Sequence, residues 1–498
     1  MTAPKKRRNS RSKKRKTDDP GWELGPIPDD IFGAATDPPP KHSDEAPPLT
    51  ITQRFRAVVG NPDIYAVAAA AFPEQTGPRV GCPPKFPPYV YLIFDSCISI
   101  FESARSAAAH LAEDLWWSIL RDSVRTILGD EHADSLRENG PTRGNWNYFF
   151  KTRMKPELAA LREASRDAWI AQALEQGLLD MEEGTWIRPA CGQVIHGDAT
   201  VAAPASRQTE LESVDKRTGE KRRHKIDPDA SYTVEGGGNR VYGNKYLSMA
   251  IRGANLPHSR VILDMETLRH KSKEADPDHE AEGVATVRML KYIASKVKAR
   301  IAYTHDIAIR GVHRAQLIAQ GIVVFTPQAE GLEPQPLQVH TCESCDHELY
   351  AAGSRVCEKK LSVDGKKIIY NPLPVSAFLP RKGKTYRFYH QVEIPCGNGP
   401  THTVNIRVDE TSEDREIDPK TGRQRLNRTE HLRIVPPPTP AGRRLKGFRQ
   451  DSEAQHSTWD LSYRHKCIPA YGADGGLAIY IGYAWLNNSV ARIHGRAT

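Results

Sequence analysis

The sequence lacks any apolar run near the roughly 20 residues that a membrane-spanning helix needs, and no apolar segment follows its basic N-terminus as in a secretory signal peptide. Cysteine is scarce, with 8 in 498 residues, which excludes a small scaffold held together by disulfides. A chain of this length favours about three domains of ordinary size, with ample residues for a hydrophobic core. We therefore expect a soluble, cytoplasmic protein with no membrane partner.

Unbalanced charge is confined to the first 16 residues. They include nine basic residues and no acid, which equals the formal net charge of +9, so the rest of the chain is balanced. Such a run repels itself and predicts a disordered arm suited to nucleic-acid phosphates, although a nuclear import signal or a solubilising tail has the same composition. The basic residues are Lys5, Lys6, Arg7, Arg8, Arg11, Lys13, Lys14, Arg15 and Lys16.

The chain divides into five blocks by composition and periodicity. We expect a disordered basic arm and Pro-rich linker over 1–52, and a helical DNA-binding domain over 53–190. An α/β core over 191–328 is followed by a β-rich insertion over 329–440 and by the last part of the core over 441–498. The aromatic residues of the helical block recur at helical spacing, which favours a role in the core: Trp116, Trp117, Trp146, Tyr148, Phe149 and Phe150.

From residue 192 the hydrophobic period changes to that of strands. The pattern predicts three strands, a helix, a strand, a helix closed by Gly321 and a further strand, which implies a mixed sheet with helices packed on it. A charged stretch over 213–230, between the first two strands, is interpreted as a mobile loop.

Two acids lie in this order where strands should end. Asp198 interrupts the first strand, "VIHGDATVAA", and Asp306 ends the fourth, "IAYTHDIAI". A solvent-facing edge strand would explain one such acid. If the two strands are neighbours, the carboxylates meet at one rim and repel each other unless a hard cation such as Mg²⁺ or Mn²⁺ lies between them. Glu453, on a late helix, is the candidate third ligand.

These segments resemble the catalytic core of bacterial insertion-sequence transposases of the DDE type. The resemblance rests on "HGDAT", on "YTHDIAIRGVHRAQLIAQGIVV" and on "GFRQDSEAQHS" with "GYAWLNNSVAR". Related enzymes often show Tyr, two residues, Arg, three residues, Glu, six residues and Lys. This chain keeps Arg449 and Glu453 at that spacing but has Lys446 and Asp460 at the outer positions.

The resemblance implies an RNase H-like fold and two Mg²⁺ or Mn²⁺ ions held by Asp198, Asp306 and Glu453, with Arg449 on a phosphate. It implies DNA cleavage and strand transfer at the terminal inverted repeats of a mobile element, by a homodimer or higher oligomer on double-stranded DNA in the bacterial nucleoid. A metal-dependent nuclease or resolvase of the same fold, and a non-catalytic DNA-binding descendant, remain alternatives.

The third carboxylate has competitors on the same predicted helix. Asp451 points about 200° away from Glu453, whereas Arg449 shares the face of Glu453. Asp460, almost two turns on, returns roughly to that face and remains a candidate outer ligand. Geometry therefore favours Glu453 over Asp451.

A cysteine cluster in the insertion raises a second metal question. "HTCESCDHELYAAGSRVCEKK" brings cysteines together with His340 and His347, and a further cysteine follows in "EIPCGNG". The C-x2-C pair is a zinc signal in a small β-rich unit, while reduced, partly buried thiols are the alternative. The candidate ligands are Cys342, Cys345, Cys357 and Cys396.

Overall fold

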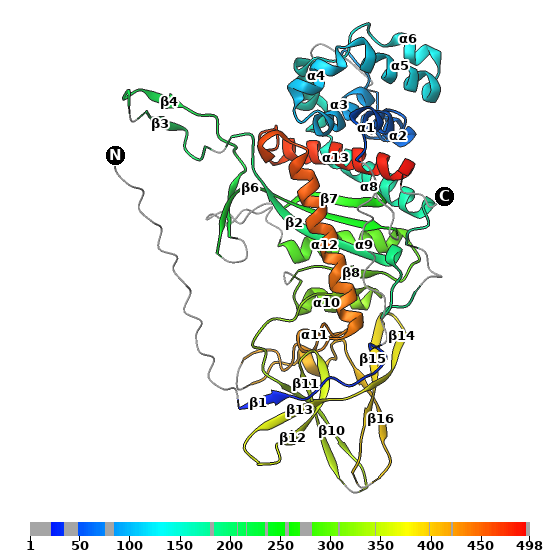
Figure 1. Ribbon diagram of the computed structural model, residues 1–498, viewed down its shortest axis with the longest axis vertical. Helices are drawn as coiled ribbons and strands as arrows, with labels where there is room; N and C mark the ends of the chain where they lie inside the picture. The colour runs from blue at the N-terminus through cyan, green and yellow to red at the C-terminus, as the bar shows by residue number, and fades with distance from the viewer. Residues whose placement is uncertain are drawn as a thin grey trace.

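The computed structural model describes residues 21–33, 48–74, 84–179, 184–206, 208–215, 217–234, 238–253, 258–268, 281–306, 309–343, 345–397, 399–419 and 422–494. The molecule is elongated, with a helical block at one end, a mixed sheet in the middle and a β-rich insert at the other end (Figure 1). It is thus an α/β protein, as the sequence predicts.

The helical block begins at a capped helix. Thr50 accepts a hydrogen bond from the backbone N–H of Gln53, and the Gln53 side chain accepts one in return, which fixes the first turn of α1. Trp116, Trp117, Trp146 and Phe149 are buried in the core as predicted, and Phe150 is partly buried against it, whereas Tyr148 is exposed, contrary to the prediction. The helices of the block are α1 (Ile51–Val59), α2 (Pro62–Ala71), α3 (Pro88–Ile100), α4 (Ala104–Leu111), α5 (Asp114–Leu128), α6 (Asp130–Ser135), α7 (Arg143–Phe149) and α8 (Leu158–Glu175).

The central sheet has the strand order β7-β6-β2-β8-β9, with β5 beside β6. Strand β6 is antiparallel to both β2 and β7, whereas β8 and β9 run parallel to β2. The predicted alternation of strands and helices is therefore confirmed. The elements are β2 (Val194–Ala202), β5 (Ser231–Val234), β6 (Arg240–Arg252), β7 (Arg260–Leu268), α9 (Glu282–Lys296), β8 (Ala302–Thr304), α10 (Gly311–Ala319) and β9 (Val323–Phe325).

The charged stretch after β2 differs from the mobile loop that we expected. Residues 212–223 include a two-stranded hairpin, β3 (Glu212–Val214) and β4 (Lys221–Arg223), which projects away from the sheet (Figure 1). A Gly at φ +73°, Gly219, allows the tight turn between the strands.

Two helices far apart in sequence cover opposite faces of β2. Val194 belongs to one hydrophobic cluster with Phe448 of α12 (Pro440–Leu461), whereas Ile195 belongs to another with Leu290 of α9. Successive side chains of a strand point to opposite faces, so Asp198 lies on the face of Val194 and His196, under α12.

The last helix, α13 (Ala473–His494), joins the helical block to the sheet. It packs against α3 and α1 on one side and against β7 on the other (Figure 1). An added Cβ at Gly482 would lie 2.5 Å from the backbone carbon of Asp95, so only glycine permits this approach to α3. The block and the sheet consequently share one hydrophobic core.

The insert is built from two separate sheets. One has the order β1-β13-β12-β11-β10 and the other the order β14-β15-β16. Their strands are β1 (Trp22–Leu24), β10 (Gln335–Thr341), β11 (Asp346–Ala352), β12 (Arg355–Leu361), β13 (Ile368–Pro372), β14 (Val375–Lys382), β15 (Tyr386–Ile394) and β16 (His402–Arg407).

Part of the expected linker belongs to this insert. Strand β1 pairs in parallel with β13, Phe32 is fully buried, and Asp30 forms a buried ion pair with Arg355. Residues 21–33 are therefore ordered against the insert, whereas the basic arm lies outside the described residues.

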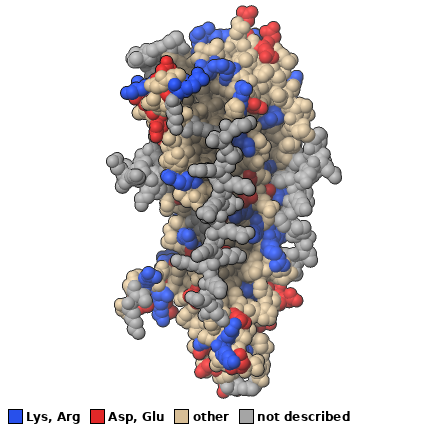
Figure 2. Space-filling model, turned by 60° about the vertical axis from the view of Figure 1, so that its left-hand side comes forward, with Lys and Arg blue, Asp and Glu red and all other residues tan. Residues whose placement is uncertain are grey.

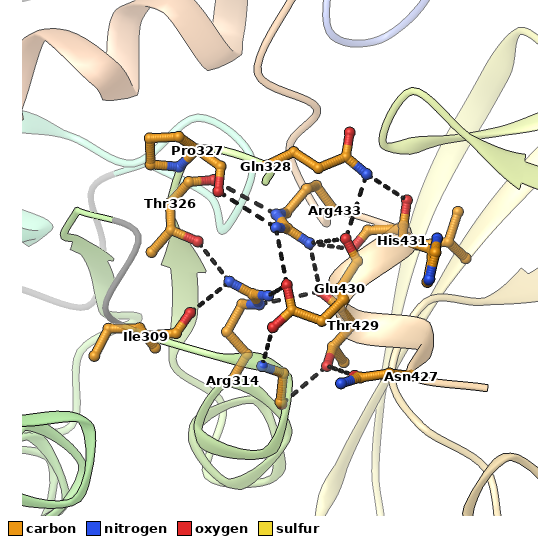
Figure 3. Close-up of polar contacts among 12 residues, drawn as sticks. Ile309, Arg314, Thr326, Pro327, Gln328, Asn427, Thr429, Glu430, His431 and Arg433 are labelled. Carbon is orange, nitrogen blue, oxygen red and sulfur yellow. Dashed lines mark hydrogen bonds and ion pairs between the residues drawn. The ribbon is translucent and has the colours of Figure 1, made fainter. Parts of the chain in front are cut away.

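A buried polar cluster ties the exit of the insert to the central sheet. Glu430 of α11 (Arg428–His431) accepts hydrogen bonds from the backbone N–H of Gly311 and pairs with Arg314 at 2.5 Å (Figure 3). Arg314 also donates to the hydroxyl of Thr326 at 2.7 Å, and Arg433 donates to the backbone carbonyl oxygen of Glu430 at 2.8 Å. Charges this deeply buried require such partners, so the cluster fixes the path of the chain into α12.

Candidate functional site

Asp198 lies in β2, and Asp306 follows the end of the neighbouring parallel strand, β8, by two residues. The register of β2 and β8 pairs His196 with Thr304. Continued by two residues, the same register places Asp198 beside Asp306. The sequence-based expectation that these two carboxylates share one rim of the sheet therefore fits the observed strand pairing.

The structure adds two side chains that the sequence reasoning did not select. Ligand atoms of Asp198, Glu282 and His305 all lie within 4.8 Å of one another. The Nδ1 of His305 is 2.8 Å from Oδ1 of Asp306, and its Nε2 is 3.4 Å from Oε1 of Glu282. The rim thus collects three carboxylates around one buried imidazole.

Local structure explains how these groups are held. Glu282 is the first residue of α9, where a negative charge is favourable at the helix N-terminus, and Lys245 of β6 pairs with it at 2.6 Å. An added Cβ at Gly197 would lie 2.4 Å from the hydroxyl of Tyr303, so glycine leaves the space that this buried ring occupies. His305 follows the last residue of β8 directly.

Burial and mutual repulsion disfavour negative charge at this rim. Burial raises the pKa of Asp198 to about 6; the charges of Asp306 and Glu282 act in the same direction, and His305 and the Ala199 N–H oppose them. Burial alone would lower the pKa of His305, but its hydrogen bond to Asp306 and the surrounding acids raise it overall. The surrounding acids therefore favour a positive charge on His305.

Helix α12 crosses β2 directly beside the acids. Ser452 lies 3.2 Å from Nδ1 of His196, and Gln455 donates to the hydroxyl of Ser248 at 3.1 Å. Ser248 is the register partner of Asp198 in β6, and Nε2 of His456 is 3.4 Å from the Ser248 hydroxyl. The residues around position 455 of α12 are thus the part of the helix closest to Asp198.

Glu453 lies on the exposed flank of that part of α12. Its side chain is 61% exposed, and it pairs with Arg449 at 3.5 Å across one helical turn. It precedes His456 by three residues and therefore occupies a neighbouring face. Glu453 is not among the residues whose ligand atoms lie within 4.8 Å of one another at the rim, namely Asp198, Glu282 and His305. Its role as a metal ligand therefore stays a prediction.

The competing acids of α12 have other surroundings. Asp451 is buried and pairs with Arg252 at 2.6 Å and with Arg260 at 3.6 Å. Asp451 and Glu453 thus differ in environment, as their predicted angular separation requires. Asp460 is half-buried, and burial raises its pKa.

A second candidate metal centre lies in the insert. Cys342, Cys345, His347 and Cys396 form a group whose ligand atoms all lie within 4.8 Å of one another. Cys357, predicted as a ligand, is not part of it, because its thiol is fully buried within the sheet and hydrogen-bonds to the carbonyl of Ala352. His347 takes its place.

Strand register explains this correction. Leu349 of β11 pairs with Glu358 of β12, so His347, two residues from Leu349, faces the same side as Glu358. Cys357 precedes Glu358 and must face the other side. The sequence shows which residues are near in the chain but not which face they occupy.

Basic side chains are available for a polyanion along the molecule. Lys221, Arg222 and Arg223 form the whole of β4 and are exposed on the projecting hairpin. Figure 2 shows Lys and Arg side chains spread along one face from the helical block to the insert. The nine basic residues of the N-terminal arm lie outside the described residues.

Comparisons with known proteins leave the family open. No protein-family model matches the chain, and a search of curated proteins finds no match. Within the residues that the structure describes, no helix is long and apolar enough to cross a membrane. The geometry of the acidic rim and of the cysteine group is therefore the basis for a functional proposal.

Proposed function

We propose that this protein is a DNA transposase that cuts DNA strands at the ends of a mobile element and joins them to a target. The observation that carries the proposal is the pairing of β2 with β8, which brings Asp198 and Asp306 to one rim beneath α12. An RNase H-like core, which the resemblance implies, is compatible with the sheet order β7-β6-β2-β8-β9.

The donor set at the rim fits a hard divalent cation. The oxygens of Asp198 and Glu282 lie close together, Asp306 is adjacent, and burial disfavours the negative charge of Asp198. Carboxylate oxygens of this kind suit Mg²⁺ or Mn²⁺. Asp198, Asp306 and Glu453 would hold the ions, with Glu282 beside them, and a bound ion would supply Lewis-acid activation at the phosphodiester.

The remaining side chains have roles that follow from their positions. His305 holds Asp306 in place through a hydrogen bond and lies against Glu282, so it orients two acids at once. Arg449 is partly exposed beside Glu453, where its guanidinium can neutralise the charge that develops on a phosphate. The exposed cations of β4 can contact the DNA backbone away from the reacting strand.

The decisive experiment is cleavage and strand transfer on DNA that carries the element ends. The element ends are to be identified beforehand as inverted repeats in the DNA that flanks the reading frame. In Mg²⁺, Asp198→Asn, Asp306→Asn and Glu453→Gln are each expected to lose both reactions by several orders of magnitude while still shifting end DNA in a gel. Glu163→Gln, at an exposed position of α8, is the matched control and should remain active.

Two outcomes would refute the proposal in different ways. Cleavage without any joined product would indicate the nuclease or resolvase alternative. Full activity of Asp198→Asn or Asp306→Asn would show that the rim is not the reaction centre.

Glu282→Gln is expected to lose roughly 10- to 100-fold of the cleavage activity, the range typical of residues that support a metal ligand.

A further inference from the structure

We propose that Cys342, Cys345, His347 and Cys396 bind one structural Zn²⁺ ion that fastens the two sheets of the insert to each other. This proposal does not depend on the proposed transposase function, because the group lies in the insert and shares no residue with the acidic rim.

The separations among the three sulfur atoms are close to those of a tetrahedral zinc site and well beyond the length of a disulfide bond. The Sγ atom of Cys345 lies 3.2 Å from that of Cys342 and 3.4 Å from that of Cys396, and the Cys342 and Cys396 sulfurs are 3.9 Å apart. Bonds of about 2.3 Å to sulfur and about 2.0 Å to nitrogen require ligand separations of roughly 3.5–3.8 Å. A disulfide would require about 2.05 Å.

The imidazole is oriented as in other zinc sites. Nε2 of His347 lies 3.2 Å from Sγ of Cys345, so it faces the thiols. Nδ1 on the other side of the ring is 2.7 Å from Oε1 of Glu358, a buried carboxylate. A histidine that binds zinc through one nitrogen commonly donates the other N–H to a carboxylate, which fixes its tautomer.

The backbone already holds the first two thiols in position. The N–H of Cys342 donates to the carbonyl of Cys345 at 2.9 Å, which closes the turn between β10 and β11. Glu358 in turn lies 2.8 Å from the ammonium of Lys360. The backbone turn and Glu358 thus support the ligands from outside the group.

The position of the group explains what the ion would do. Cys342 and Cys345 lie in the turn between β10 and β11 of the five-stranded sheet and His347 lies in β11, whereas Cys396 follows β15 of the three-stranded sheet. Among the described strands no backbone ladder joins these two sheets. One ion shared by both would therefore cross-link them at this end of the insert.

Metal analysis of the purified full chain tests the proposal. Protein produced with zinc in the medium should hold about one equivalent, and Cys396→Ser or His347→Gln should lose most of it. Cys357→Ser and His340→Gln are matched controls, since both residues lie near the group but outside it, and they should keep the ion. Equal zinc content in Cys396→Ser and the unchanged protein would overturn the assignment.

A variant that misfolds would also lose zinc, so the unchanged protein is tested separately by reconstitution with Co²⁺. Co²⁺ bound by three thiolates should give strong sulfur-to-metal charge-transfer absorption, and proteolysis within 340–400 should accelerate when the metal is removed. Absence of that absorption, less than a tenth of an equivalent of zinc, or a Cys342–Cys345 disulfide in freshly purified protein would each refute the site.

Discussion

Asp451 and Glu453 offer a test in which stability and chemistry should separate. The carboxylate of Asp451 is 6% exposed and lies 2.6 Å from the guanidinium of Arg252, itself 3% exposed. Glu453, two residues on, is 61% exposed and pairs with Arg449, whose side chain is 36% exposed. The two acids are therefore a buried structural anion and an open candidate ligand on the same helix.

The magnitude follows from the burial of the ion pair. Removing one partner of a buried pair costs about 3–5 kcal/mol, because the other charge remains without compensation. Asn at position 451 can still accept one hydrogen bond from Arg252, so we expect Asp451→Asn to cost about 3 kcal/mol, the lower end of that range. The urea dependence of unfolding is roughly 1–3 kcal/mol per M for small proteins and increases with size, so the unfolding midpoint of this long chain should fall by up to about 1 M. Glu453→Gln should leave it unchanged.

Urea unfolding followed by tryptophan fluorescence provides the measurement, since Trp459 is buried on the same helix. Folded Asp451→Asn, assayed at low temperature, should still cut and join DNA, whereas Glu453→Gln should be stable and inactive. An active Glu453→Gln together with an inactive but stable Asp451→Asn would show that the third ligand has been placed on the wrong side of α12.

Three further perturbations test other parts of the molecule. Deleting residues 1–16 should weaken binding to any duplex and flatten the slope of log K against log salt by at most roughly 8 units; loss of end-sequence preference at an unchanged slope would contradict this. Replacing Lys221, Arg222 and Arg223 with Gln should flatten that slope by up to roughly 3 units at unchanged melting temperature, and an unaltered slope would exclude the hairpin from the DNA. Burial lowers the pKa of His390 to about 4, so the folded insert cannot take up a proton that the unfolded chain binds near pH 6.5. Stability should fall by up to about 3 kcal/mol as the pH drops from about 6.5 to about 4. His390→Gln should reduce that pH dependence, as measured by urea unfolding; an equal loss in the variant would contradict it.

The succession of strands and helices along the core was accessible from the sequence because it is encoded locally. Apolar β-branched runs mark β2, β6 and β7, and the 3.6-residue period marks α9 and α10. The pairing of β1 with β13 was not accessible in the same way, since three residues some 350 positions from their partner carry no local signal of it. The hairpin of β3 and β4 was missed because its strands are too short and too charged to show alternation.

The acidic rim shows the same division between local and non-local information. Asp198 and Asp306 stand out because acids are rare at strand ends, and a parallel pairing of their strands brings them together. Glu282 gives no such signal: an acid at the first turn of a helix is usual, and only the packing of α9 against the sheet brings it to the rim. His305 adjoins Asp306 in the sequence, but a histidine at the end of a strand does not by itself indicate a site. Its role becomes evident from its burial between Asp306 and Glu282. The acids at the rim therefore include one that the pattern of the sequence does not reveal, and the activity of Glu282→Gln measures how much this fourth carboxylate contributes.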